Sequence, residues 1–358
     1  MRIPRKRSVQ EEGSVISAKN IAIVALIFGC AFLAVSFRSN DVVRLMTEVQ
    51  PTEVQPSAVA AAAKAVQASS SVAQKTSSSS ILVPQHSGSS DFQLANDESF
   101  GFFTDIPERE WKLLKERVKE IQPNMCDWCR GGNLANAWFQ NHFEPEFACR
   151  HEKRVGRQGD GGKWICDPHR YLEKKDCLVY SVGSNNDFSF EREVKKVIGK
   201  HCEIHTFDPD DYSERAKEEG SIYHQWGISN EALTNRRGQV MKTLRQTAEE
   251  LGHIGRTIDI FKIDCEGCEL DSYETWVDSS TVGVNLQQVL VEIHAKGKPN
   301  ARMNQEVVQP ATENFFKGMH KHGYVIFHKE PNIHYWAMGN CVEFAFMKLA
   351  PSFFEGMD

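Results

Sequence analysis

Two short stretches place acidic side chains and a histidine where strands are expected to end. "KIDCEGCEL" (262–270) follows the apolar run "TIDIF" and supplies Asp264 and Glu266, and "VLVEIH" (289–294) supplies Glu292 and His294. Within each pair the spacing is two, so on a strand both side chains would point to one face. Burying several carboxylates without partners costs several kcal/mol, so we expect a cleft around a hydroxyl substrate or a cation. The alternative is that these carboxylates cap helices.

A glycine and an aspartate follow two earlier apolar runs. Gly183 comes after "CLVYSV", and Asp208 comes after "EIHTF". A residue without Cβ lets a ligand lie against the backbone, and the N–H groups of a following helix can bind a carboxylate. An acid after the second strand is where nucleotide-binding folds hold ribose hydroxyls. A plain turn at Gly183 and a turn or helix-capping role for Asp208 are the alternatives.

Strand and helix patterns alternate from Cys177 onward, which positions these residues. Strands are expected at 177–183, 203–207, 221–227, 257–263, 287–294, 323–330 and 341–349. Helices are expected at 188–199, from 212, and at 240–252, 270–277 and 305–322. Such alternation predicts an α/β fold with a mostly parallel sheet, helices on both faces and one antiparallel edge strand. In such sheets the ligand binds beyond the carboxyl ends of the strands.

The paired phrases also carry a family resemblance. "KIDCEGCE" and "VLVEIH" resemble the FkbM-type family of S-adenosylmethionine-dependent methyltransferases, in which the phrases are close to "KIDVEGAE" and "LLEIH". "FDPD" resembles the acidic second-strand end of that family. "RVGRQGDGGKW" (154–164) resembles an entry segment of membrane-anchored eukaryotic methyltransferase-like relatives. The sequence departs from the family at Cys265 and Cys268, and it has Ser184, Asn185 and Asn186 in place of a second loop glycine.

The resemblance implies a Rossmann-like methyltransferase sheet that binds S-adenosylmethionine. It places the methionine portion over Gly183 and Ser184, the ribose at Asp208, the adenine against Trp226 or Ile228, and the sulfonium near Asp264. A hydroxyl acceptor needs its proton removed, and the candidate catalytic residues are Asp264, Glu266, Glu292 and His294. The acceptor would be a hydroxyl, or a carboxyl, on a glycan, a protein or a small metabolite. We predict no bound metal, although these four side chains are suitable ligands for a divalent cation.

The first part of the chain predicts a membrane anchor. Residues 21–37 are 17 uncharged residues, about 25 Å of helix, and the preceding flank is mainly basic. The predicted organisation is a cytosolic tail (1–20), a transmembrane signal anchor (21–37), a low-complexity disordered stem (38–97), a Cys-rich extension (98–176) and a Rossmann-like methyltransferase domain (177–358). This organisation predicts a type II membrane protein of the Golgi or endoplasmic reticulum with a lumenal head.

Charge and cysteine content bear on partners and compartment. Residues 1–38 hold six basic and two acidic residues, so with a net charge of −6 for the whole chain the remainder carries −10. We therefore expect no nucleic-acid partner. Ten cysteines occur, nine of them after the anchor, and a lumenal location favours disulfides with at least one cysteine unpaired. Zinc binding or redox chemistry at "CDWC" (126–129) and "CEGC" (265–268) remains open.

Two other functions fit part of the pattern. A type II Golgi glycosyltransferase would use Asp208-Pro209-Asp210 as an acid-x-acid motif for a metal and a nucleotide sugar. A catalytically inactive interaction module would keep the fold alone. The glycosyltransferase interpretation does not explain the acidic phrases after the fourth and fifth strands.

Overall fold

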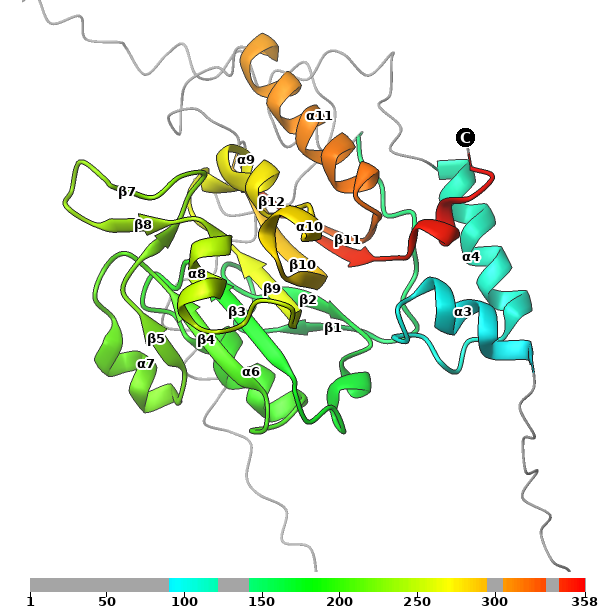
Figure 1. Cartoon of the computed structure of the whole chain (residues 1–358), viewed down its shortest axis with the longest axis horizontal. Coiled ribbons are helices and arrows are strands. Elements are labelled where there is room, and N and C mark those ends of the chain that lie inside the picture. Colours follow the sequence, from blue (N-terminus) through cyan, green and yellow to red (C-terminus); the bar gives the residue numbers. More distant parts are fainter. Residues whose placement is uncertain (1–89, 122–141, 295–304, 333–340, 358) are drawn as a thin grey trace, which may run out of the picture. The chain divides into compact units, whose positions relative to one another are not determined.

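Seven strands pair into one mixed sheet in this computed structural model, which describes residues 90–121, 142–294, 305–332 and 341–357 (Figure 1). They are β3 (Leu178–Val182), β4 (Glu203–Phe207), β5 (Ile222–His224), β9 (Thr257–Ile263), β10 (Asn285–His294), β11 (Tyr324–Pro331) and β12 (Cys341–Lys348). Their spatial order is β5-β4-β3-β9-β10-β12-β11. Counted along the chain this is 3-2-1-4-5-7-6, the order of the Rossmann-like methyltransferase sheet that the resemblance implied.

The antiparallel strand was predicted at the edge of the sheet, but it lies inside the sheet. Strand β12 runs between β10 and β11 and is antiparallel to both, so β11 forms the edge. The reason is the close succession of the last two strands, which favours a hairpin. The hairpin turns back so that its second strand pairs with β10.

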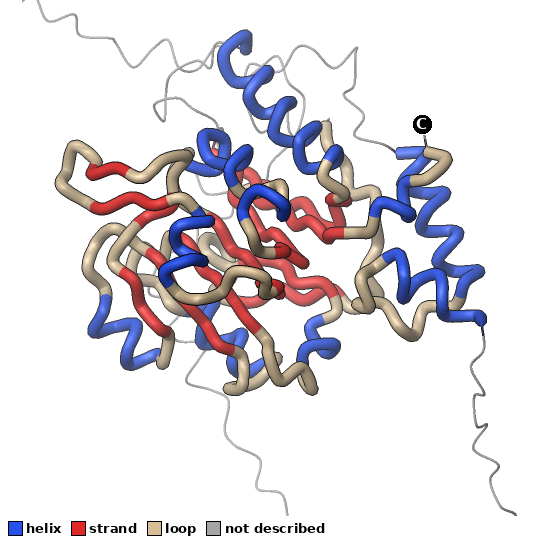
Figure 2. The backbone as a smooth tube through the Cα atoms, viewed as in Figure 1, coloured by secondary structure: helices blue, strands red, loops and turns tan. Residues whose placement is uncertain are grey.

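Helices cover both faces of the sheet (Figure 2). They are α6 (Ser189–Val197), α7 (Ser213–Glu219), α8 (Leu244–Glu250), α9 (Cys268–Ser272), α10 (Ser279–Val282) and α11 (Gln305–Lys321). Every residue of β3 is buried, and its side chains alternate between two cores. Tyr180 and Val182 belong to the core that α8, α9, α10 and α11 cover, and Val179 belongs to the core that contains Val194 of α6.

Part of the predicted Cys-rich extension packs against the second of these cores. It contains α4 (Glu108–Ile121) and a hairpin of β1 (Glu152–Val155) and β2 (Lys163–Cys166). The predicted amphipathic helix is confirmed, because Trp111 and Val118 of α4 are buried in that core. Phe353, near the C-terminus, packs edge-on against Trp111 at a centroid distance of 5.5 Å, and the C-terminus lies beside α4 (Figure 1).

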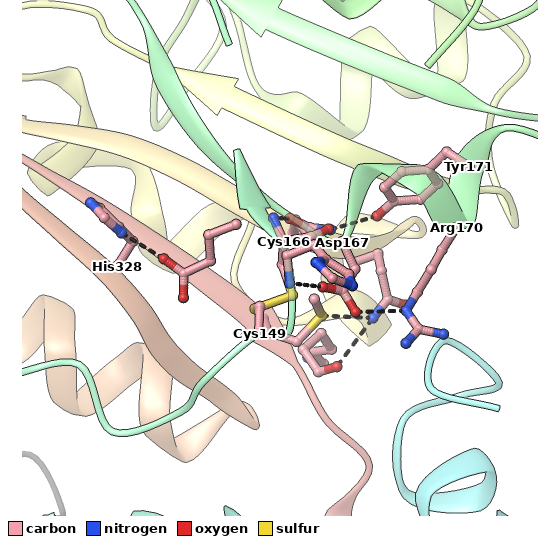
Figure 3. The surroundings of a disulfide bond; sticks show 12 residues. Cys149, Cys166, Asp167, Arg170, Tyr171 and His328 are labelled. Atoms are coloured by element: carbon pink, nitrogen blue, oxygen red, sulfur yellow. Dashed lines mark hydrogen bonds and ion pairs between the residues drawn. A yellow bond between two sulfur atoms is a disulfide. The ribbon is translucent and has the colours of Figure 1, made fainter. Parts of the chain in front are cut away.

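A buried glutamine holds the hairpin to the sheet, and a disulfide joins it to the segment before β1. Cys149 and Cys166 are bonded to each other, with Asp167 and Arg170 close by (Figure 3). Gln288 of β10 accepts a hydrogen bond from the Cys166 backbone N–H and donates one to the Cys166 carbonyl, both at 2.9 Å. Hydrogen bonds therefore hold β2 to the sheet, and the disulfide joins β2 to the segment before β1.

The structure corrects the predicted elements between residues 221 and 277. The strand predicted at 221–227 divides into β5 and β6 (Gly227–Ile228), and the helix predicted at 240–252 begins with β8 (Val240–Lys242). Strands β6, β8 and β7 (Leu233–Thr234) form a small separate sheet. Helix α8 starts only after Thr243, whose side chain and that of Gln246 cap each other's backbone N–H groups. The helix predicted at 270–277 is α9 followed by a 3₁₀ turn, Tyr273–Thr275.

Most of the predicted membrane-proximal region lies outside the described residues. This applies to the tail, the anchor, residues 38–89 of the stem and the CDWC motif, all of which remain predictions. Described structure begins at a 3₁₀ turn, Ser90–Phe92, and α3 (Gln93–Glu98), before the expected boundary at 98. Among the described residues, no helix combines the length and apolar composition that crossing a bilayer requires.

Candidate active site

The carboxyl ends of β3, β4 and β9 meet at Gly183. Its N–H donates to the Phe207 carbonyl at 2.9 Å, and the Asp264 N–H donates to the Val182 carbonyl at 3.1 Å. The φ angle of Gly183 is +78°, and a Cβ atom there would lie 1.7 Å from the Asp264 carbonyl oxygen. Glycine is therefore required because the end of β9 passes directly against this residue. The prediction had instead explained it by space for a ligand.

The loop after Gly183 explains why a second glycine is not needed. Asn185 and Asn186 have φ angles of +42° and +62°. Asparagine enters this left-handed region more readily than most residues, because its short side chain can hydrogen-bond locally. The two asparagines therefore allow the turn that a glycine would otherwise make.

Asp208 holds this loop in place. Its Oδ2 accepts hydrogen bonds from the backbone N–H groups of Ser184 and Asn185 at 2.8 and 2.9 Å, and from the Ser184 hydroxyl at 3.2 Å. Its Oδ1 accepts from the Asp210 N–H at 3.0 Å. The side chain thus joins the ends of β3 and β4. Since each carboxylate oxygen has two lone pairs, Oδ1 keeps acceptor capacity for the predicted ribose contact.

The two candidates for the adenine side differ in exposure. Ile228 is fully buried in the core, whereas Trp226 is half-buried. The Trp226 indole N–H donates to the Thr247 hydroxyl at 3.2 Å, and the Lys242 ammonium lies 3.7 Å from the centre of its ring. Of the two, Trp226 is the one that a ligand can reach.

A cleft of about 530 Å³ adjoins this region. Its lining includes Pro209 and Asp210, which follow Asp208, Gln225, which precedes Trp226, and Gln239 in the β7–β8 turn. This volume falls within the range of small-molecule sites, about 300–1,000 Å³. The cleft is therefore lined by chain neighbours of Asp208 and Trp226, and not by these two side chains themselves.

A buried lysine lies at the centre of the acidic side chains. Lys163 of β2 is 1% exposed. Its Nζ lies 2.6 Å from Glu343 Oε1, 3.1 Å from Asp264 Oδ2 and 3.6 Å from Glu292 Oε2. Glu292 and Glu343 stand directly opposite each other on β10 and β12. The structure therefore brings Asp264 and Glu292 together as predicted, around a lysine and a third acid that the sequence analysis missed.

These groups have different proton affinities. Burial alone would raise the pKa of Asp264, but the positive charges of Lys163, Lys262 and His294 outweigh it and lower that pKa below its usual range. Burial and then the negative charge of Asp264 raise the pKa of Glu292. Burial also raises the pKa of Glu343 well above its ordinary value. The cluster thus combines an ionised aspartate with two glutamates that hold protons more readily.

His294 lies between acidic side chains. Its Nδ1 lies 3.1 Å from Glu269 Oε1, and its Nε2 lies 3.9 Å from Asp264 Oδ1. Burial opposes the charged form, but hydrogen bonds to Cys341 and Glu269 prevail and raise the pKa of His294 to about 12. This shift favours the protonated imidazole, and the role of His294 as a base stays a prediction, as do those of Asp264, Glu266 and Glu292.

The two glutamates at the CEGC loop, Glu266 and Glu269, differ in exposure. The Glu266 side chain is 85% exposed and lies 3.7 Å from the His294 Nε2 atom, and its φ angle is +59°. Glu269 is fully buried and accepts hydrogen bonds from the N–H groups of Cys265 and Gly267 at 2.7 and 2.8 Å. A Cys265–Cys268 disulfide closes the loop. Glu269, which the sequence analysis missed, therefore fixes the loop beside His294.

Lys262 also supports the carboxyl edge of the sheet at Gly183. It is buried, and its Nζ donates to the Gly183 carbonyl at 2.7 Å. Its ammonium therefore supports the loop after β3. Among the described residues, Asp264, Glu269 and His294 form one group whose ligand atoms lie within 4.8 Å of one another, and Glu292, His294 and Cys341 form another. The prediction that no metal binds stays untested.

The fold and this edge define a Rossmann-like enzyme of the methyltransferase type. Residues 93–348 match the model of a family described as "Methyltransferase domain", and the chain belongs to that family. The protein is therefore a methyltransferase, and the predicted cofactor, S-adenosylmethionine, is the methyl donor of this class of enzyme. No curated protein matches the chain.

Solved structures resemble the chain only distantly. A Methanococcus jannaschii fibrillarin pre-rRNA processing protein has 9% identity and a TM-score of 0.30, over 56% of this chain and 83% of that one. An Aeropyrum pernix fibrillarin with bound S-adenosyl-L-methionine has 12% identity and a TM-score of 0.30, over 55% and 83%. An Aquifex aeolicus SAM-dependent methyltransferase has 11% identity and a TM-score of 0.30, over 51% and 89%.

The glycosyltransferase alternative is wrong, because the chain belongs to a methyltransferase family. The arrangement of Asp208-Pro209-Asp210 also differs from a motif in which both carboxylates bind one metal. Asp208 turns inward to the loop at Ser184, and Asp210 Oδ1 accepts a hydrogen bond from the Gln239 side chain at 2.6 Å. The two carboxylates therefore serve separate local structures. The family also argues against an inactive interaction module.

Proposed function

We propose that the protein transfers the methyl group of S-adenosylmethionine to a hydroxyl or carboxyl group of a glycan, a protein or a small metabolite in the secretory pathway. One observation carries the proposal. A continuous set of contacts joins the predicted cofactor residues to the predicted catalytic residues along one edge of the sheet. The set runs from Asp208 through the Gly183–Ser184 turn to Asp264, and from there through Lys163 to Glu292.

The residues at the β3 and β4 ends fit S-adenosylmethionine. The loop from Gly183 to Asn186 contains three left-handed residues and is fixed by Asp208, so its backbone shape is set before a ligand arrives. The adjoining cleft of about 530 Å³ is large enough for a nucleoside, and Gln225, which precedes Trp226, lines it. When bound, the cofactor supplies an electrophilic methyl group on a positively charged sulfur. The ionised Asp264 gives the neighbouring edge a matching negative charge.

The acidic cluster supplies the groups that a hydroxyl acceptor needs. Methyl transfer depends mainly on holding the acceptor oxygen in line, so a fixed hydrogen-bond acceptor is valuable. The Asp264 side chain is 18% exposed, against 3% for Glu292, and Lys163 holds it in place. Asp264 would therefore orient the hydroxyl. Glu292, whose pKa is raised, is the better proton acceptor.

Disulfides support the proposed compartment. The described residues contain the bonded pairs Cys149–Cys166, Cys177–Cys202 and Cys265–Cys268, and Cys341 is the free cysteine among them. Such bonds persist in oxidising compartments such as the lumen of the endoplasmic reticulum. With the uncharged run at 21–37, they favour a type II protein of the Golgi or endoplasmic reticulum with the enzymatic part in the lumen. The proposal includes that the protein is related to FkbM-type methyltransferases.

Calorimetry and a transfer assay test this function. S-adenosylhomocysteine is titrated into the purified full-length protein and into an Asp208→Ala variant, with UDP and Mn²⁺ as the control ligand pair. We expect binding of the nucleoside, no binding of UDP, and affinity weakened about 10–100-fold in the variant, because hydrogen bonds to a charged group contribute about 1.5–3 kcal/mol each. Equal affinity in both proteins would defeat the assignment. Radiolabelled S-adenosylmethionine with glycan, protein and metabolite fractions then identifies the acceptor class.

A further inference from the structure

Two histidines and a glutamate meet at the opposite, amino edge of the sheet. Glu203 is the first residue of β4, His205 lies two residues later on the same face, and His253 lies between α8 and β9. The Glu203 Oε1 atom lies 2.9 Å from His205 Nε2 and 3.5 Å from His253 Nε2. One ligand atom from each residue falls within 4.8 Å of the others. We propose that Glu203, His205 and His253 form a zinc-binding site.

The spacing of the three atoms fits the geometry of zinc. Zinc–nitrogen and zinc–oxygen bonds of about 2.0–2.1 Å in a tetrahedron place neighbouring ligand atoms about 3.3 Å apart. The two distances from Glu203 Oε1 lie on either side of this value. Two imidazoles and one carboxylate are a known zinc set that leaves the fourth position to water. The partly exposed Glu203 side chain, at 36%, gives water access from one side.

Hydrogen bonds orient the Nδ1 atom of each histidine and the second oxygen of Glu203, as is usual for metal ligands. The His253 Nδ1 lies 2.6 Å from the Tyr180 hydroxyl, and the His205 Nδ1 lies 2.8 Å from the His224 Nε2. Arg256 donates to the second oxygen of Glu203 at 2.9 Å. Such partners orient a ligating ring and fix the tautomer whose other nitrogen faces the metal. Both Nε2 atoms are thereby directed at the first oxygen of Glu203.

A cation also lies beside the proposed site. Arg256 is the nearest cation and keeps its contact with the outer oxygen of Glu203, so metal binding need not displace it.

The site is separate from the active site. Asp208 comes five residues after Glu203 along the chain, which at about 3.3 Å per residue of strand corresponds to roughly 17 Å. A zinc ion there would join β4 to the segment that leads into β9, the strand that ends at Asp264. Its expected effect is to stabilise the sheet. The proposal does not depend on the proposed methyl acceptor.

Calorimetry with zinc on the full-length, chelator-treated protein tests the site. We expect one Zn²⁺ per chain, and at a free concentration 100 times the Kd a rise in Tm of about 5–10 °C. Glu203→Gln keeps the shape of the side chain and should weaken binding more than 10-fold while the protein still folds. His253→Asn should do the same, and Co²⁺ should give the visible absorption of a tetrahedral site that both variants lose.

Two further variants distinguish this site from other metal-binding groups. His294→Asn alters the cluster with Glu292 and Cys341, and His201→Asn removes an exposed histidine; both should leave zinc affinity unchanged. The proposal is overturned if the wild-type protein binds no zinc, if Glu203→Gln and His253→Asn bind it like wild type, or if His294→Asn alone abolishes binding. Methyl transfer by the Glu203→Gln variant should stay within 2-fold of wild type.

Discussion

Replacing Lys163 by methionine removes the cation at the centre of the acidic cluster and keeps most of the side-chain volume. The ammonium is buried and lies within 3.6 Å of Glu343, Asp264 and Glu292. Removing one partner of a buried ion pair costs about 3–5 kcal/mol, because the other charge stays buried without compensation. We therefore expect the Lys163→Met variant to lose about 3–5 kcal/mol of unfolding free energy at pH 7.5.

The pH dependence gives this prediction a sign. The folded-state pKa of Asp264 is lowered from 3.8, so its ionisation contributes stability above the unfolded pKa and loses it as pH falls. Lys163 supplies most of that stabilisation, and without it all three carboxyl groups take up protons more readily. The difference between variant and wild type should thus be largest well above the ordinary carboxyl pKa values of 3.8 and 4.5 and should shrink as pH falls through them.

Urea unfolding followed by circular dichroism at pH 7.5 and pH 4.5 measures both effects. Lys153→Met is the matched control, because Lys153 is an exposed lysine on the same hairpin and its loss should change stability by less than about 0.5 kcal/mol. A Lys163→Met variant within 1 kcal/mol of the control at pH 7.5 would refute the reasoning. So would a penalty that grows as pH falls.

Two other predictions concern catalysis and the disulfides. Glu292→Gln should lower kcat by about 10²–10⁴ and remove the rise of kcat/KM with increasing pH, a rise centred above 4.5 because the pKa of Glu292 is raised; persistence of that rise in the variant would exclude Glu292 as the base. Serine at both Cys177 and Cys202 should cost about 3.5 kcal/mol in calorimetric unfolding, and serine at both Cys265 and Cys268 about 1.6 kcal/mol, because the closed loops differ in length, at separations of 25 and 3 residues. The reverse order would contradict the loop-entropy explanation.

The sequence predicted the cofactor edge because parallel strands place their carboxyl ends together. Counting strands was therefore enough to bring Asp208, Gly183 and Asp264 to one edge. The buried apolar runs of β3, β9 and β10 made those strands unambiguous. The spacing of two also grouped Glu292 with His294, and both lie beside Asp264 in the structure.

Long-range packing decided what the sequence did not show. Lys163 comes from a hairpin that folds over the sheet, and no local pattern tells where such a hairpin packs. Glu343 interrupts the apolar run of β12, and that interruption was the available signal for a third acid. The raised pKa of His294 follows from hydrogen bonds to Cys341 and to the buried Glu269, and the position of Glu269 depends on the turn of the CEGC loop.

Local side-chain chemistry explains the misplaced helix start. The pattern from 240 to 252 is periodic enough for a helix, but Thr243 and Gln246 cap the backbone and begin α8 at Leu244. The preceding residues pair with β6 and β7 instead. A capping box inside a predicted helix was the feature that could have located this boundary.

Hydrogen–deuterium exchange with and without S-adenosylhomocysteine tests the central claim most directly. Binding at the carboxyl edge should slow exchange of the backbone amides in 183–187, 208–211 and 225–226. The amino edge of β4 should exchange as before. Protection confined to other segments, or none at a saturating ligand concentration, would contradict a methyl-donor site built from Gly183, Asp208 and Asp264.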